Sequence, residues 1–240
     1  MFFVLNKEKM KSYLISLSTV VILLMLSVML QNNISNKVIN TSGTLTKTPI
    51  CSVETTEKEV ALSINCVENM NNLDNILDTL SKMNSKATFF VTGDIVDKYP
   101  NEVKKIINNG NEIGNLGDKY KSFKQMSKDE IRTQMQNCNK KVEGATSTIP
   151  KLFRVPYGEY TNAIMNEAEN NNMKVVGWNI DSLDYNELTE DEIWERIDEN
   201  LANGSIILMH NEYMNNNLEN ILHNIQGENY KIVRVSDLIK

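Results

Sequence analysis

From Glu59 onward the sequence alternates short apolar runs with longer amphipathic stretches, which limits the chain to few architectures. The short runs have the composition of strands: Val60–Asn65, Ala87–Val91, Glu112–Asn115, Leu152–Arg154, Val175–Asn179, Ser205–His210 and Lys231–Val233. The stretches between them have helical spacing: Leu73–Met83, Asn101–Asn108, Lys128–Val142, Thr161–Asn171, Glu190–Leu201 and Leu218–Ile225. This alternation predicts an α/β fold with a parallel sheet, either open or closed into a barrel.

Two of the predicted helices carry clear start signals. Ser127 stands three residues before Glu130, and Thr189 stands three residues before Glu192. In each pair the hydroxyl and the carboxylate can satisfy each other's free backbone N–H groups, which is the capping-box arrangement. The sequence therefore predicts helix starts at these two positions.

Size and charge narrow the class of protein. The 240 residues are 41% hydrophobic, enough for one sizeable domain, and the formal charge is −6. Lysine and arginine are scattered rather than gathered into a basic stripe, so we expect no nucleic-acid partner. The three cysteines, Cys51, Cys66 and Cys138, form no C-x-x-C pair and allow at most one disulfide.

The N-terminal region has the pattern of a membrane segment. Tyr13–Leu30 is an uncharged apolar run preceded by three lysines. At about 1.5 Å per residue it nearly matches a hydrocarbon core of roughly 30 Å. We expect a retained single-pass anchor, with a cleaved signal peptide as the alternative. The lysines then stay in the cytoplasm, and the rest of the chain lies outside it, held at the cell membrane or secreted if the segment is cleaved.

These signals divide the chain into four parts. Residues 1–12 form a cytoplasmic segment and residues 13–30 the anchor or signal peptide. Residues 31–57 form a polar linker rich in Asn, Ser and Thr, and residues 58–240 form the folded domain.

Six segments of the domain together resemble a known family. In order they are VALSIN, KATFFVTG, GNEIGNLG, RVPYG, GWNIDSLDY and GSIILMHN. They resemble the polysaccharide deacetylases, which are also called carbohydrate esterase family 4 or the NodB homology domain, over residues 58–240. The resemblance implies an irregular (β/α) barrel with its site at the C-terminal ends of the strands. Asn65, Asn115, Arg154 and His210 fall at such ends in the predicted strands.

The resemblance also implies a chemistry, the removal of N-acetyl groups from sugars such as those of peptidoglycan or chitin. The family uses a divalent metal such as zinc, held by one aspartate and two histidines. A second aspartate acts as general base and a distant histidine as general acid. The metal lowers the pKa of its bound water from about 15.7 to near 7.

This chain departs from the family pattern at the base and at every metal ligand. Asn65 stands where the base aspartate belongs and Cys66 where the metal-binding aspartate belongs. Leu116 and Tyr120 align with the two histidines. Leucine has no donor atom, and a phenol with a pKa near 10 is a poor ligand at neutral pH. We therefore expect no metal cofactor, and Cys66 is interpreted as a small buried side chain.

The opposite half of the family's site is present in the sequence. By the resemblance, Arg154 orients the base and the backbone N–H of Tyr157 contributes to the oxyanion hole. In an unrelated protein Arg154 would be read as a member of an ordinary ion pair.

The histidine side of the site is carried by two further segments. The resemblance makes His210 the acid that protonates the leaving amine, and Leu208 a wall of the acetyl pocket. Asp184 is the expected partner of His210, Asp181 is a second candidate, and Tyr185 replaces a tryptophan.

The sequence thus favours a membrane-anchored, exported pseudoenzyme that keeps a glycan groove, with peptidoglycan or another N-acetylated glycan as partner. Two alternatives stay open. One is an active deacetylase in which Cys66, Asp184 and His210 gather around a metal. The other is a scaffold for cell-envelope or spore-coat assembly that binds another protein through its surface.

Overall fold

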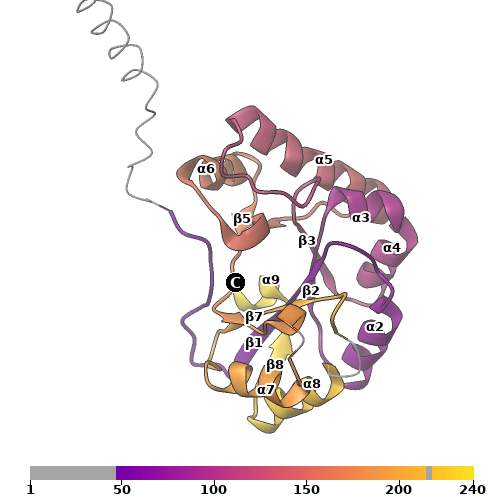
Figure 1. Ribbon diagram of the computed structural model, residues 1–240, viewed down its shortest axis with the longest axis vertical. Helices are drawn as coiled ribbons and strands as arrows, with labels where there is room; N and C mark the ends of the chain where they lie inside the picture. Colours follow the sequence, from indigo (N-terminus) through magenta and orange to yellow (C-terminus); the bar gives the residue numbers. More distant parts are fainter. Residues whose placement is uncertain (1–46, 187, 215–217) are drawn as a thin grey trace, which may run out of the picture. The chain divides into compact units, whose positions relative to one another are not determined.

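The computed structural model (Figure 1) describes residues 47–186, 188–214 and 218–240. The chain divides into two units, residues 1–44 and 45–240, and the described residues belong to the second. The predicted membrane segment, residues 13–30, lies outside the described residues. Within the described ranges, no helix has both the length and the apolar character needed to cross a membrane.

The domain is built on a curled, wholly parallel sheet, a half-barrel of the α/β class. Its strands are hydrogen-bonded in the order β5-β4-β3-β2-β1-β7-β6, and β8 pairs with β1. The strands are β1 (Glu59–Cys66), β2 (Thr88–Val91), β3 (Glu112–Asn115), β4 (Leu152–Phe153), β5 (Lys174–Val175), β6 (Ile180–Asp181), β7 (Ile206–His210) and β8 (Lys231–Val233). The central β1 places Asn65 directly beside His210 of β7.

Helices follow most strands, and all but α9 lie along the outside of the curled sheet in Figure 1; α9 contributes Val235 and Leu238 to the buried cluster around Phe90. They are α2 (Leu73–Lys82), α3 (Gly93–Lys98), α4 (Pro100–Asn108), α5 (Lys128–Thr146), α6 (Asn162–Asn170), α7 (Glu190–Asp198), α8 (Leu218–Gly227) and α9 (Val235–Leu238). Two short 3-10 turns, η1 (Pro156–Gly158) and η2 (Asp184–Asn186), occur in the loops. Both predicted capping boxes are confirmed, at the starts of α5 and α7.

The alternation of side chains along β1 separates two buried clusters. Leu62, Ile64 and Cys66 belong to an outer cluster, shared with the helices that cover the sheet. Ala61 belongs to an inner cluster, inside the curl of the sheet, together with Phe90. Neighbouring residues of β1 therefore face opposite sides of the sheet.

The structure corrects one predicted strand and adds elements that the pattern did not reveal. The run Val175–Asn179 does not continue as one strand, because the chain leaves β5 and then pairs with β7 at the other edge as β6. The helices α3 and α9 are six and four residues long. Segments of that length are too short to show helical periodicity.

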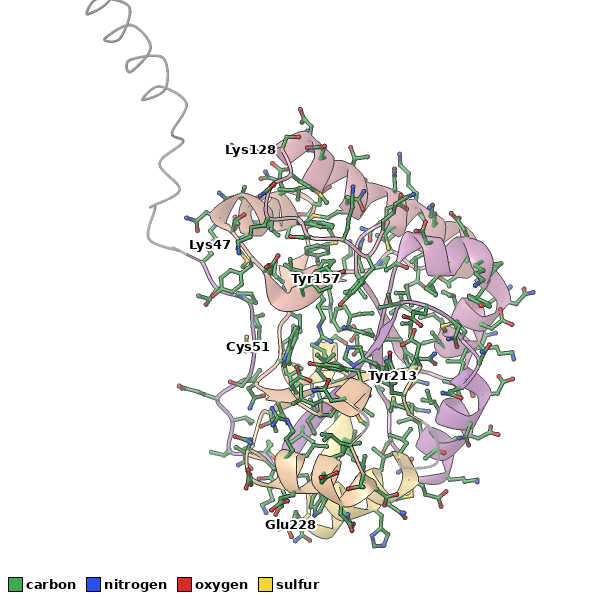
Figure 2. All side chains as sticks on the ribbon, viewed as in Figure 1. Lys47, Cys51, Lys128, Tyr157, Tyr213 and Glu228 are labelled. Carbon is green, nitrogen blue, oxygen red and sulfur yellow. The ribbon has the colours of Figure 1, made fainter. Side chains whose placement is uncertain are left out.

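Residues that precede β1 bridge the opening between the two edges of the sheet. The Ile50 N–H donates to the Val175 carbonyl at 2.9 Å, and the Gly177 N–H donates to the Ile50 carbonyl at 2.9 Å. Three residues later, the Val53 N–H donates to the Gly204 carbonyl at 2.9 Å. Figure 2 shows Cys51 on this extended segment. The end of the region interpreted as linker thus forms a seam, residues 50–53, along the domain.

Gly204 provides a test of this seam. A Cβ at Gly204 would lie 1.8 Å from the Val53 carbonyl oxygen, and its φ of +77° disfavours other residues. We predict that Gly204→Ala lowers the free energy of unfolding by more than about 1 kcal/mol. Gly144→Ala is the control, because a Cβ there meets nothing within 4 Å. It should stabilise the helix by about 0.5–1 kcal/mol. Urea unfolding measures both, and equal effects would contradict the seam.

Candidate functional site

A cavity of about 440 Å³ lies at the C-terminal ends of β1 and β7. Its wall combines polar groups of these strands with aromatic rings from several loops, namely Tyr120, Tyr157, Trp178, Tyr185 and Tyr213. Figure 2 labels two of these rings, Tyr157 on η1 and Tyr213 in the turn after β7. Aromatic rings give large apolar faces with a polar tip, which suits a ligand that has both apolar faces and hydroxyl groups.

One side of the cavity is organised by His210 and Asp184. The Nδ1 of His210 lies 2.8 Å from Asp184 Oδ1, and the backbone N–H of His210 donates to Asp184 Oδ2 at 2.7 Å. The carboxylate is almost completely buried. It therefore fixes the orientation of the imidazole, whose other nitrogen is left for the cavity. Tyr185 packs edge-on against the imidazole with ring centroids 5.1 Å apart.

Arg154 lies below Asn65 and, with the groups it contacts, forms the floor of the cavity. The guanidinium is fully buried and donates to Asn65 Oδ1 at 3.1 Å, to Ser63 Oγ at 2.8 Å and to the Gly177 carbonyl at 3.0 Å. It stacks over the Phe90 ring at 4.0 Å from the centroid. Among the described ion pairs none involves Arg154. Burial lowers its pKa to about 9, so a cation without a contacting carboxylate lies in the core at neutral pH.

Asn65 supplies an amide where the family pattern has a basic carboxylate. Its side-chain oxygen accepts a hydrogen bond from Arg154, and only 3% of the residue is exposed. An amide cannot accept a proton at neutral pH. The cavity therefore has no general base at this position.

The other ligand positions do not fit a metal either. Cys66 lies in the outer cluster, and burial, helped by the charge of Glu212, raises the pKa of its thiol well above the usual value. Leu116 is fully buried in the inner cluster. Among the described residues, no group of three or more His, Cys, Asp or Glu side chains could hold a metal ion. The three cysteines are free thiols.

Tyr120 lies in the cavity wall next to Tyr157, with ring centroids 4.7 Å apart. Burial raises the pKa of the Tyr120 phenol, and the nearby Tyr157 backbone N–H offsets part of the rise. This N–H is the one that the family resemblance assigns to the oxyanion hole. One tyrosine therefore stands in place of a metal ligand and also lies beside the expected oxyanion donor.

The remaining predicted residues lie around the same cavity. Asp181, Tyr185 and Leu208 line it, and Asp184 lies behind His210. Asp181 Oδ1 accepts the Leu183 N–H at 3.1 Å. The structure thus brings together every predicted site residue except Cys66 and Leu116, which are buried in the two clusters.

Glu212 is a site residue that the sequence did not reveal. Its Oε1 accepts the backbone N–H groups of Val67 at 2.8 Å and Glu68 at 2.7 Å. The carboxylate thereby holds the loop after β1 against the turn after β7, and Val67 and Glu68 line the cavity with it. No sequence motif predicts that a carboxylate will accept hydrogen bonds from a loop distant in sequence. The one available signal was that Glu212 lies two residues after His210.

Comparison with known proteins agrees with this fold. The family model for polysaccharide deacetylase matches residues 52–176. A peptidoglycan-N-acetylglucosamine deacetylase of Bacillus cereus is 34% identical over 152 residues, covering 63% of this chain and 55% of that protein. The chain spans about half the length of the curated relatives it matches. It belongs to the polysaccharide deacetylase family.

Solved structures include similar proteins with and without activity. A CE4 family pseudoenzyme from Bacillus anthracis is 28% identical, with a TM-score of 0.78 over 82% of this chain and 70% of that one. A mutant of that protein with restored enzymatic activity gives the same TM-score of 0.78. A peptidoglycan N-acetylglucosamine deacetylase, Bc1960, is 28% identical, with a TM-score of 0.75 over 78% of this chain and 91% of that one.

Arg154 and Asn65 allow a direct test of the floor. We predict that Asn65→Asp raises the free energy of unfolding by roughly 1.5–3 kcal/mol, the worth of a hydrogen bond to a charged group. The reason is that the buried guanidinium gains a carboxylate 3.1 Å away. The gain should be present at neutral pH and lost as the pH falls through the depressed pKa of the new carboxyl group. Urea unfolding across pH measures it.

The control for this prediction is the same substitution in an Arg154→Met background. There the new carboxylate has no cation and should destabilise the domain. A gain of equal size in both backgrounds would contradict the pairing.

Proposed function

We propose that this chain is an exported, membrane-anchored pseudoenzyme of the polysaccharide deacetylase family that binds an amino-sugar glycan of the cell envelope, such as peptidoglycan, in the cavity beside His210. The observation that carries the proposal is the asymmetry of the cavity. The His210 side is intact, with Nδ1 2.8 Å from Asp184, whereas the base and metal positions hold Asn65, Cys66, Leu116 and Tyr120.

The loss of hydrolysis follows from the chemistry of these four positions. The family's metal lowers the pKa of water from about 15.7 to near 7. At about 1.36 kcal/mol per pKa unit, that corresponds to at most roughly 12 kcal/mol of proton-removal cost. The residues present do not fit a metal, and no carboxylate stands at the base position. Water in this cavity therefore stays a weak nucleophile.

The backbone around the cavity supports a retained binding role. Tyr157 and Leu183 have positive φ values, 60° and 52°. In bulky residues this conformation is strained, by about 1–3 kcal/mol each. The other described non-glycine residues with positive φ are three asparagines, a residue type that tolerates this conformation, and one serine; they are Asn84, Asn172, Asn229 and Ser147. Strain in bulky residues is thus concentrated beside the cavity, as expected where a ligand depends on the geometry.

The relatives give this proposal its ligand class. Curated relatives are named as deacetylases of peptidoglycan N-acetylglucosamine in Bacillus cereus and of peptidoglycan N-acetylmuramic acid in Bacillus subtilis. The similar Bacillus anthracis structure is described as a pseudoenzyme. Location rests on the apolar run at residues 13–30, which would keep the domain at the outer face of the membrane.

The alternative of a rearranged metal site has little support. It needs Cys66 beside Asp184 and His210, but the described residues contain no group of three or more His, Cys, Asp or Glu side chains that could hold a metal ion, and burial raises the pKa of the Cys66 thiol. A surface-binding scaffold has no observation of its own in its favour. The cavity is therefore the better candidate for the function.

Restoring the four positions tests the proposal. We predict that the unmodified chain, with zinc added, releases no acetate from peptidoglycan or from acetylated chitooligosaccharide. The variant with Asn65→Asp, Cys66→Asp, Leu116→His and Tyr120→His should bind zinc and release acetate. Acetate release and zinc content of the purified proteins measure the two effects.

The matched control is the triple variant that retains Tyr120. It lacks one metal ligand and keeps the Tyr120 phenol beside the Tyr157 N–H, so its rate should be at least about 100-fold lower. Chelator-sensitive hydrolysis by the unmodified chain would contradict the proposal. An inactive, zinc-loaded quadruple variant would show that these positions do not explain the loss.

A further inference from the structure

The charge of the cavity wall identifies the kind of sugar that fits it, and this inference rests on the proposed glycan binding. Three carboxylates, Glu68, Asp181 and Glu212, line the cavity, and among its described lining residues there is no lysine or arginine. Arg154 lies under Asn65 and offsets one of these charges. The wall seen by a ligand is therefore acidic as well as aromatic.

The carboxylates are held in place by the fold rather than gathered loosely at the surface. Glu212 is fixed by two backbone N–H groups through Oε1. Asp181 accepts the Leu183 N–H through Oδ1, and after burial its charge is the main cause that raises the pKa of the Tyr185 phenol. Glu68 is exposed, on the loop that Glu212 holds, and none of the described ion pairs involves it. These positions offer acceptors to the cavity, and none of the three carboxylates belongs to a described ion pair.

An acetamide finds poor partners in this cavity. Its carbonyl oxygen needs a donor or a cation, but the residues at the metal positions do not fit a metal. The Tyr157 N–H lies beside the Tyr120 phenol, whose ring packs 4.7 Å from that of Tyr157 and crowds this donor. A protonated amine has the opposite requirement, because an ammonium group is a donor only and pairs well with carboxylates.

We propose that the cavity recognises amino sugars whose nitrogen is free and protonated, in preference to N-acetylated ones. The aromatic rings contact the faces of the sugar, and the carboxylates select the ammonium group. The chain would then bind glycan strands from which acetyl groups have already been removed, which is the product of the family's reaction rather than its substrate.

Two tetrasaccharides of equal length test this selectivity. The purified full-length chain is titrated calorimetrically with a glucosamine tetramer and with the N-acetylglucosamine tetramer made from it by acetylation. We expect the amine form to bind at least about tenfold more tightly, as one charge-assisted contact can supply. Tetralysine, with similar charge but no sugar faces, should bind more weakly than the glucosamine tetramer.

Variants locate the effect in the cavity. Glu68→Gln and Asp181→Asn keep the shape but remove charge, so each should weaken binding of the glucosamine tetramer more than that of the acetylated tetramer and reduce the preference severalfold. Glu143→Gln, an exposed glutamate on α5, is the matched control and should change neither affinity.

The outcomes separate the two proposals. Equal affinities, tighter binding of the acetylated tetramer, or a preference unchanged in both cavity variants would overturn the selectivity and leave glycan binding intact. Tetralysine binding as tightly as the glucosamine tetramer would also overturn it. No binding of either tetramer would remove the proposed glycan binding, and the selectivity with it.

Discussion

The buried guanidinium of Arg154 is the interaction around which the cavity floor is arranged. It donates to Ser63 and Asn65 of β1 and to the Gly177 carbonyl, where the chain leaves β5. A buried charge is costly unless its donors are satisfied, so these acceptors must stay in place. Compared with the aspartate of the family pattern, Asn65 keeps an acceptor oxygen for Arg154 but lacks the negative charge that would balance the guanidinium. The floor thus survives in shape, and the domain carries a cation that its core no longer neutralises with a contacting carboxylate.

The altered positions are consistent with one another, because each suits a cavity without a metal. Cys66 and Leu116 join apolar clusters, where stranded carboxylate or imidazole groups would be costly. Tyr120 fills space beside Tyr157, with ring centroids 4.7 Å apart. A single substitution would leave the remaining metal ligands unpaired around an empty site. Substitution at all of these positions leaves no unpaired metal ligand. The pattern therefore indicates a site rebuilt around a different use.

Much of this arrangement could be predicted from the sequence, and what escaped has physical reasons. The apolar runs predicted the long strands well, as in β1 and β7. Two-residue strands such as β6 are too short to show a hydrophobic period. Motif spacing identified Asp184 as the partner of His210, while Glu212 was missed because its partners are backbone groups far away in the sequence. Cys66 faces the outer cluster, away from the cavity, because successive side chains of β1 alternate between the two faces of the sheet. Motif spacing alone did not predict which face Cys66 would occupy.

Retention of the His210–Asp184 pair does not by itself indicate catalysis. Asp184 also accepts the backbone N–H of His210, so the pair fastens η2 to the end of β7 and would be kept for the fold alone. The exposed rings argue differently, because Tyr157 and Tyr213 are 57% and 43% exposed and contribute little to the core. Tyr157 is in addition held in a strained conformation. Exposed aromatic area and strain together cost stability unless a ligand uses them, which supports the proposal that this cavity is kept for binding rather than for residual hydrolysis.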